Sequence, residues 1–229
     1  MSSYDNYLSS SQKQLSNSFT RSQEILYSRM DLGLIFKRIF DVVVSFVGLI
    51  VFLPLMIILA VVVKFTSPGP IFFGSERVGI GGQIFRMIKF RSMVVNADKI
   101  GSLVTAGNDP RITPIGKYLR DYKWDELPSL WNVLKGDMSF VGPRPENPRS
   151  VASYTENQRR ILTVKPGITS LATIKYRYEE EILSEADDLD EAYFRIMQDK
   201  LKIDLEYLEN RSFTKDIRII FQTLVEIVK

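Results

Sequence analysis

Two adjacent acids, Asp125 and Glu126, are the strongest candidates for chemistry in this 229-residue chain. A carboxylate can attack phosphorus and form an acyl phosphate, so the aspartate can act as a nucleophile while its neighbour serves as acid or base. The same pattern is typical of a helix start, with Asp125 as N-cap, Pro128 in the first turn and Gly136 at the end. Capping alone is the commoner role of such an aspartate, but the positive end of a helix would also suit a phosphate.

Basic residues next to proline or glycine turns form a second set that suits phosphate chemistry. Arginine can bind phosphate oxygens through two parallel hydrogen bonds, and a diphosphate with Mg²⁺ needs several cations around it. Each residue alone is more commonly a solvated surface side chain, so the prediction depends on the whole set. Its members are Lys89, Arg91, Arg120, Arg144 between Pro143 and Pro145, Lys165, Lys175 and Arg177.

The residue types that the chain lacks exclude several kinds of active site. It contains no cysteine and no histidine, which excludes disulfides, cysteine nucleophiles, Ser-His arrangements and the usual zinc sites. An oxygen-ligated Mg²⁺ remains compatible with the composition. The net charge of +3 fits an anionic membrane surface or a phosphate-bearing substrate, but it is too small to indicate nucleic-acid binding on its own.

The segment from Val42 to Val63 predicts that this chemistry takes place at a membrane. It has no charged residue, and about 20 apolar residues suffice to cross a bilayer as a helix. Pro54 near its middle favours a kink. Basic residues usually mark the cytoplasmic side, and they flank both ends here, so a re-entrant hairpin is favoured over a simple span. They are Arg21, Arg29, Lys37 and Arg38 before the segment and Lys64, Arg77, Arg86, Lys89 and Arg91 after it.

The rest of the chain predicts a polar arm followed by short strands and helices. The first 29 residues are rich in Ser, Asn and Gln and are expected to be poorly ordered. Strands are expected at 71–73 and 84–90 around a glycine-rich hairpin turn, and 168–178 is expected to be extended. Helices are expected over 119–135, 185–209 and 213–228. The apolar stripes of the last two suit either core packing or a membrane interface, and both alternatives stay open.

Taken together, these residues resemble the bacterial sugar transferases, also called monotopic phosphoglycosyl transferases. The resemblance runs from about Phe36 to the C-terminus, and its longest and most specific part is the run from Trp131 to Pro145. The motifs that carry it are Lys37-Arg-Ile-Phe-Asp41, Glu76-Arg-Val-Gly79, Lys89-Phe-Arg-Ser-Met93, Asp125-Glu-Leu-Pro128, Trp131-Asn-Val-Leu-Lys-Gly-Asp-Met-Ser-Phe-Val-Gly-Pro-Arg-Pro145 and Pro166-Gly-Ile-Thr169.

The resemblance implies a reaction. Family members transfer a phosphosugar from a UDP-sugar to undecaprenyl phosphate and release UMP, which begins glycoconjugate or polysaccharide assembly. It implies that Asp125 and Glu126 are the catalytic pair, that Asp125 carries a covalent phosphosugar in ping-pong kinetics, and that Mg²⁺ contacts Asp125. The implied substrate-binding residues are Lys89, Arg91, Arg120, Pro143, Arg144, Pro145 and Arg177.

The resemblance also implies an α/β (α+β) fold with three parts. These are a poorly ordered arm over residues 1–35, a re-entrant membrane helix over 36–66, and a small, mostly helical catalytic domain with interfacial amphipathic helices over 67–229. The catalytic domain is then expected on the cytoplasmic face of the bacterial inner membrane, in contact with membrane lipid and not with nucleic acid. A homodimer is compatible with the sequence.

The sequence departs from the family pattern at four places: Leu53 before the helix proline, Ser75 before Glu76, and Ser170 and Thr173 after the Pro-Gly-Ile-Thr motif. These departures leave the preference for sugar or acceptor open, with glucose, galactose and acetylated amino sugars all candidates. Two other functions are also weighed. A non-catalytic protein that holds anionic lipid would need neither Asp125 nor Mg²⁺, and an ordinary glycosyltransferase would release UDP instead of UMP.

Overall fold

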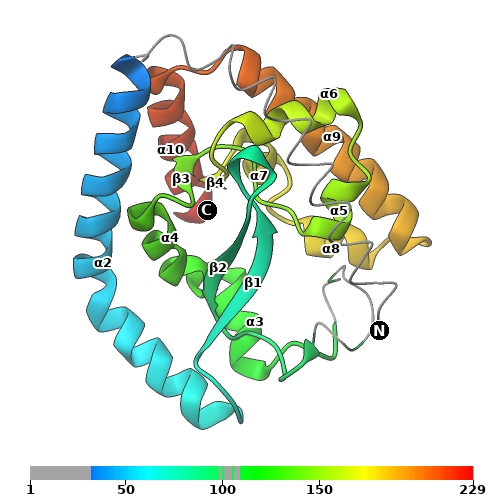
Figure 1. The fold of residues 1–229 in the computed structure, drawn as a ribbon. Helices are drawn as coiled ribbons and strands as arrows, with labels where there is room; N and C mark the ends of the chain where they lie inside the picture. The colour runs from blue at the N-terminus through cyan, green and yellow to red at the C-terminus, as the bar shows by residue number, and fades with distance from the viewer. Residues whose placement is uncertain (1–31, 98–99, 101–104, 106–108, 229) are drawn as a thin grey trace, which may run out of the picture.

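The computed structural model describes residues 32–97, 100, 105 and 109–228. The predicted N-terminal arm lies outside the described residues as far as residue 31, and residues 32–35 belong to a helix. In the described part, helices dominate over two small sheets, in agreement with the expected mixed fold class. Figure 1 shows one long helix along a side of the molecule, a β-hairpin near its centre and most of the later helices beyond the hairpin, with the last helix beside the N-terminal part of the long one.

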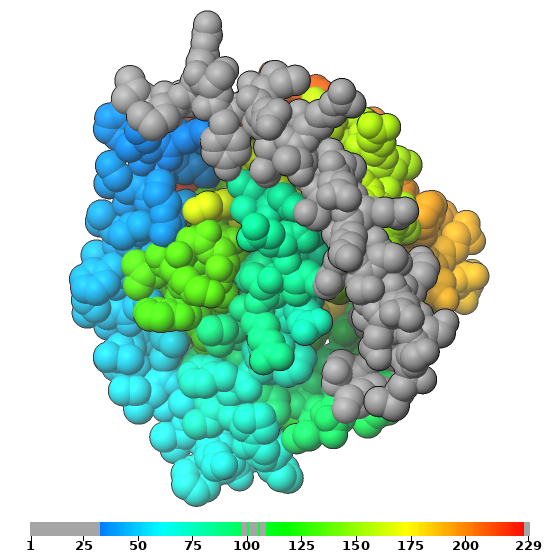
Figure 2. Space-filling view, viewed as in Figure 1, coloured from blue at the N-terminus to red at the C-terminus, as the bar shows by residue number. Residues whose placement is uncertain are grey.

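Helix α2 (Leu32–Thr66) contains the predicted membrane segment and extends it at both ends. Its 35 residues correspond to about 52 Å of helix. Among the described residues it is the one helix long and apolar enough to cross a membrane, and only 11% of its most apolar window is buried. Its side chains form one edge of the molecule (Figure 2). This exposure is expected of a lipid-facing helix and not of a core helix.

The two ends of α2 contact the same folded body. Near the N-terminal end, the Arg38 guanidinium donates to the carbonyl oxygens of Val133 and Leu134 at 2.8 and 2.9 Å, and Asp41 Oδ1 accepts from the Phe140 N–H at 3.1 Å. Near the other end, Leu59 and Val63 pack in one apolar cluster with Phe90 and Leu119. The helix continues past Pro54 and bends toward the body in its C-terminal part (Figure 1).

A β-hairpin follows, as the sequence predicted. Strand β1 (Phe72–Val78) pairs antiparallel with β2 (Ile84–Phe90) around the short 3₁₀ turn η1 (Ile80–Gly82). Gly81 and Gly82 have φ values of 65° and 77°, which glycine adopts without steric strain. The first strand is longer than the expected 71–73 because its pairing continues along the whole of β2.

A second, two-stranded parallel sheet joins β3 (Ser139–Val141) to β4 (Gly167–Thr169). The chain approaches itself closely here: a Cβ on Gly142 would lie 2.4 Å from the Lys165 carbonyl oxygen, and one on Gly167 would lie 2.2 Å from the Gly142 nitrogen. The extended segment expected over 168–178 is wrong beyond Thr169, because α7 (Leu171–Lys175) begins there. Ser170 caps this helix by accepting from the Thr173 N–H at 3.1 Å.

The helix expected over 119–135 is divided in the structure. Helix α3 (Pro114–Asp121) ends first, the 3₁₀ helix η3 (Trp124–Ser129) follows, and α4 (Leu130–Lys135) completes the segment. The predicted stop is confirmed: Gly136 has φ 101°, and its N–H donates to Asn132 and Val133 at the end of α4. The remaining helices are α5 (Pro148–Ala152), α6 (Glu156–Arg159), η4 (Arg160–Thr163), α8 (Glu179–Ser184), α9 (Leu189–Glu209) and α10 (Phe213–Val228).

The late helices α9 and α10 differ in how much of their apolar surface is buried. Met197 and Leu201 of α9 pack into a core cluster with Val78 of the hairpin and with residues around η4. Helix α10 buries Ile219 against Val141 and Tyr207, but it leaves Phe221 66% exposed. Core packing therefore accounts for α9, whereas α10 keeps an uncovered apolar face.

Candidate active site

The two acids lie in the first turn of η3, not at the N-cap of an α-helix. The cap position belongs to Lys123, which has φ 56° and forms no side-chain cap. The Glu126 N–H donates to the Lys123 carbonyl oxygen at 3.3 Å, which closes the turn. The expectation that Asp125 caps a helix is therefore wrong, because the left-handed backbone at Lys123 starts the turn two residues earlier.

Asp125 is buried and incompletely hydrogen-bonded. Its residue is 5% exposed, and its Oδ1 atom has no hydrogen-bond partner. Burial raises the pKa of the Asp125 carboxyl, while the positive charge of Lys89 opposes that shift and the neighbouring Glu126 adds to it. An acid in this position has a free oxygen and a charge that the enclosing protein does not fully neutralise.

Glu126 is held between two cations. Lys89 Nζ donates to Glu126 Oε1 at 2.7 Å, and the Arg144 guanidinium donates to both carboxylate oxygens, with Nη1 3.3 Å from Oε2. Burial alone would raise the pKa of Glu126, but Arg144 and Lys89 together hold it well below its usual range. The two acids thus differ in kind: Glu126 is ionised and paired, whereas the buried Oδ1 of Asp125 has no hydrogen-bond partner.

Lys89 and Arg144 reach the dyad, the adjacent acids Asp125 and Glu126, from different elements. Lys89 lies on β2, which packs on η3, and Asn132 of α4 fixes this arrangement by accepting from the Ile88 N–H at 3.0 Å and donating to the Arg86 carbonyl oxygen at 2.8 Å. Asn132 was not singled out from the sequence, because its partners are backbone groups of a distant strand. Burial lowers the pKa of Lys89, and the charge of Glu126 opposes this.

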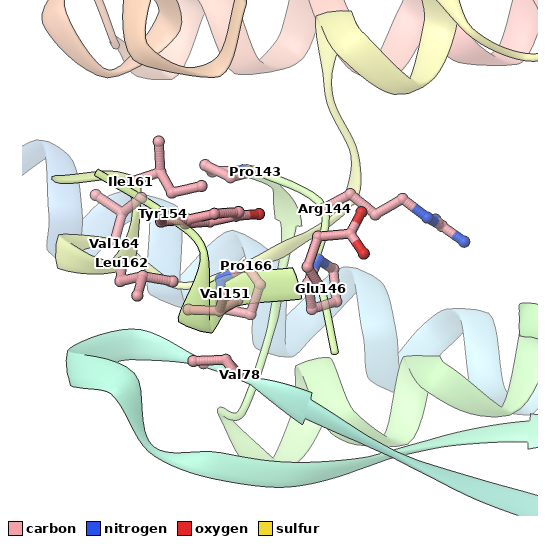
Figure 3. Close-up of a pocket in the computed structure, with 12 residues that line it drawn as sticks. Val78, Pro143, Arg144, Glu146, Val151, Tyr154, Ile161, Leu162, Val164 and Pro166 are labelled. Carbon is pink, nitrogen blue, oxygen red and sulfur yellow. The ribbon is translucent and has the colours of Figure 1, made fainter. Parts of the chain in front are cut away.

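Arg144 is presented by the tight loop that follows β3. Gly142 and Gly167 allow this loop to lie against β4, and the Gly167 N–H donates to the Pro143 carbonyl oxygen at 2.9 Å. Figure 3 shows the Arg144 side chain pointing away from a small cavity that Pro143 lines. Pro145 lines the same cavity. The cavity of about 10 Å³ holds no more than about one water. Both prolines, which flank Arg144 in the chain, are buried.

Arg91 is not brought to the dyad. Its Nη2 donates to the Ser67 carbonyl oxygen at 2.6 Å, to the Ser67 hydroxyl at 2.7 Å and to the Val63 carbonyl oxygen at 3.3 Å. These acceptors belong to the C-terminal end of α2, where a cation is favoured by the helix dipole. The structure therefore gives Arg91 a position at the C-terminal end of α2 and no contact with Asp125 or Glu126.

Arg120 forms an ion pair with the short segment that also carries Arg177. The Arg120 guanidinium forms an ion pair with Glu180, and its charge lowers the pKa of Asp125 as one of the lesser influences. Arg177 lies with its guanidinium carbon 5.5 Å from the centre of the Tyr178 ring, on the same segment as Glu180. Arg120 thus belongs electrostatically to the dyad, although its guanidinium is directed to Glu180.

A magnesium ion at the expected position would have few protein ligands among the described residues. They contain no group of three or more acidic, histidine or cysteine side chains able to hold a metal ion. A hard cation that keeps waters and substrate phosphates as ligands needs only one or two carboxylates. The unpartnered, buried Oδ1 of Asp125 fits that requirement, so the residues present are compatible with Mg²⁺ bound jointly by Asp125 and a diphosphate.

Comparison with known proteins places this geometry in context. A family model described as bacterial sugar transferase matches residues 32–229. A UDP-N-acetylgalactosamine-undecaprenyl-phosphate N-acetylgalactosaminephosphotransferase of Aeromonas hydrophila is 38% identical over 193 residues, which cover 82% of this chain and 42% of the relative. A UDP-glucose:undecaprenyl-phosphate glucose-1-phosphate transferase of Klebsiella pneumoniae is 38% identical over 203 residues, covering 84% of this chain and 40% of the relative.

A shorter relative matches over most of its own length. The exopolysaccharide production protein ExoY of Sinorhizobium fredii is 32% identical over 208 residues, covering 84% of this chain and 85% of the relative. The chain therefore spans about two fifths of the length of the first two relatives and aligns with most of the third.

Proposed function

The chain belongs to the bacterial sugar transferase family, and from this premise we propose that it transfers a sugar 1-phosphate from a UDP-sugar to undecaprenyl phosphate and releases UMP. The names of two relatives describe transfer of a sugar phosphate to undecaprenyl phosphate. The sugars in those names differ, so the proposal leaves the sugar open. The name of a third relative links the family to exopolysaccharide production.

The observation that carries the proposal is the difference between the two buried acids. A nucleophile needs a free oxygen, and Asp125 Oδ1 has no hydrogen-bond partner. Glu126 has both carboxylate oxygens engaged by Arg144 and Lys89. Asp125 is therefore the acid suited to attack, and Glu126 is suited to hold two cations where phosphate charge must be stabilised.

The first half-reaction follows from this arrangement. An Asp125 carboxylate oxygen attacks the β-phosphorus of the UDP-sugar, and a P–O bond forms as the bond from that phosphorus to the bridging oxygen breaks. UMP leaves with the bridging oxygen, and the sugar phosphate stays on Asp125 as an acyl phosphate. Lys89 and Arg144 are placed to stabilise the charge that develops on the phosphoryl oxygens.

The second half-reaction restores the enzyme. A phosphate oxygen of undecaprenyl phosphate attacks the same phosphorus, and the bond to Asp125 breaks to regenerate its carboxylate. The product is a sugar linked through a diphosphate to undecaprenol. Mg²⁺, held by Asp125 and the phosphates, would neutralise diphosphate charge when bound. The two half-reactions share one nucleophile, so ping-pong kinetics are expected.

We place α2 in the inner membrane as a re-entrant helix, with the folded body on the cytoplasmic face. Near one end of α2, Arg38 donates to a carbonyl oxygen of the folded body, and at the other end Arg91 of that body donates to Ser67. Both ends of the helix are thus attached to one body, which supports an entry and an exit on one side of the membrane. The exposed apolar face of α10 is suited to lie in the membrane interface beside it. The chain has no cysteine, so Ser10→Cys and Lys117→Cys can be labelled singly in intact cells. Labelling of position 10 alone from outside would establish a simple span.

The proposal is tested by nucleotide release. Purified protein in detergent is mixed with undecaprenyl phosphate, Mg²⁺ and a panel of UDP-sugars, and the released nucleotide is identified. Release of UMP over multiple turnovers, dependent on the lipid phosphate, is the expected result. Release of UDP would indicate an ordinary glycosyltransferase. Absence of nucleotide release with the whole panel would favour a non-catalytic protein that holds anionic lipid.

A further inference from the structure

The ion pair between Arg120 and Glu180 has a geometry that matches phosphate binding. Two guanidinium nitrogens face the two carboxylate oxygens: Nη2 donates to Oε1, and Nε lies 3.4 Å from Oε2. This paired arrangement is the one by which arginine also binds a phosphate group. Glu180 therefore occupies the face of Arg120 that a phosphate would need.

Arg120 is otherwise placed to serve the dyad. It lies at the end of α3, directly before the turn that carries Asp125. Burial raises the pKa of Asp125, and the charge of Arg120 is one of those that oppose this rise. Lys89 and Arg144 are both engaged by Glu126. A donor diphosphate would thus find three cations around Asp125, each already paired with a glutamate.

The segment that carries Glu180 is anchored independently of this ion pair. Glu179 Oε2 at the start of α8 accepts from Lys200 Nζ at 2.5 Å, and Tyr176 at the end of α7 donates to Asp199 at 2.7 Å, so the chain is attached to α9 on both sides of Arg177. The Glu180 side chain is 34% exposed, against 19% for Arg120. Rotation of Glu180 into solvent can therefore free Arg120 without displacement of α8.

We propose that Glu180 is an internal competitor for the donor: it occupies the Arg120 guanidinium in the empty site, is displaced by a phosphate of the nucleotide sugar, and so sets donor affinity. The proposal deepens the function proposed above and rests on it. When a site is competent to bind for only a fraction of the time, its apparent dissociation constant is the intrinsic one divided by that fraction. The same competition favours release of the UMP product, because Glu180 returns to Arg120.

The test measures access to Arg120 directly and needs no turnover. Phenylglyoxal modifies free guanidinium groups, and peptide mass spectrometry quantifies the reaction at Arg120. Inorganic pyrophosphate serves as the competing ligand. In Glu180→Gln we expect faster modification of Arg120, and protection by pyrophosphate at an about three- to tenfold lower concentration than in the unaltered protein. Glu181→Gln removes a charge from the same helix and is expected to change neither quantity.

Two results would overturn the proposal. Protection in Glu180→Gln at the same or a higher pyrophosphate concentration would show that Glu180 does not compete, or that it positions Arg120 for phosphate. Lack of protection in every variant would show that Arg120 binds no phosphate. Glu180→Ala with a thermal unfolding control repeats the measurement with a different side chain. UMP release by the unaltered protein is assayed separately, so failure of the proposed reaction and failure of this inference give different results.

Discussion

Lys89 Nζ donates a 2.7 Å hydrogen bond to Glu126 Oε1, on the carboxylate that Arg144 also binds. This lysine is therefore hydrogen-bonded to the second acid and influences the first through its charge. Asp125 remains buried with one unpartnered oxygen.

Replacement of the proposed nucleophile should abolish chemistry and preserve the fold. Asp125→Asn keeps the volume of the side chain and removes a buried charge whose Oδ1 has no partner, so we expect no loss of thermal stability. Turnover should fall by at least about 10³-fold. UMP release and thermal unfolding, measured on the same preparation, provide the check. Substantial turnover by the folded variant would remove Asp125 from the nucleophilic role.

Lys89 should control the acid side of the pH profile. Burial raises the pKa of Asp125, and the Lys89 charge is the largest influence opposing that shift. In the proposed mechanism Asp125 attacks in its ionised form, so activity should be lost as pH falls through its pKa. Lys89→Met removes the opposing charge and should move this limb of kcat/KM to higher pH, with activity lowered by about 10²-fold.

The matched control for that experiment is Lys117→Met, which removes an exposed lysine from α3. Its pH profile should superimpose on that of the unaltered protein. An acid limb that stays in place in Lys89→Met would show that the lysine charge does not influence the ionisation of the nucleophile. Glu126 would then have to account for the effect of the site on Asp125.

Asp204 should make folding stability depend on pH. It lies on α9 in the core, 5% exposed, with Oδ1 unpartnered, and burial raises its pKa to about 7 from the ordinary 3.8. The native protein therefore binds a proton that the unfolded chain has released, and stability contributed by Asp204 is lost as pH rises between about 4 and 7.

Asp204→Asn should remove that dependence. We expect its melting temperature to exceed that of the unaltered protein by at least about 3 °C at pH 8, with the difference shrinking toward pH 4. Differential scanning calorimetry across this range is the measurement. Asp187→Asn, at an exposed position, is the control. A constant difference at all pH values would show that Asp204 does not titrate between the native and unfolded states.

Asp125 and Glu126 were singled out from the sequence, but their local conformation was not predicted. The motif around Asp125 reads as a helix start, and the structure forms a 3₁₀ turn with Lys123 left-handed. The ion pairs of Glu126 with Lys89 and Arg144 hold the turn in this less common backbone conformation. Contacts between residues 18 and 37 positions apart leave no local sequence signal.

Arg91 shows the same limit in a different way. Two residues apart on a strand, Lys89 and Arg91 would share a face, and the sequence motif groups them. Strand β2 ends at Phe90, so Arg91 leaves that face and turns to the end of α2. Glu180 had no signal of any kind, because its partner Arg120 lies 60 residues earlier. The long apolar helix and the hairpin were predictable because their signals are local runs and turns.

The covalent intermediate tests the central claim most directly. The protein is mixed with the active UDP-sugar and Mg²⁺ in the absence of undecaprenyl phosphate, quenched rapidly and analysed by intact and peptide mass spectrometry. The account predicts one sugar phosphate added to Asp125 and one UMP released per protein molecule, with no adduct in Asp125→Asn. UMP release only when the lipid phosphate is present, without any adduct, would contradict it by showing direct transfer between the two substrates.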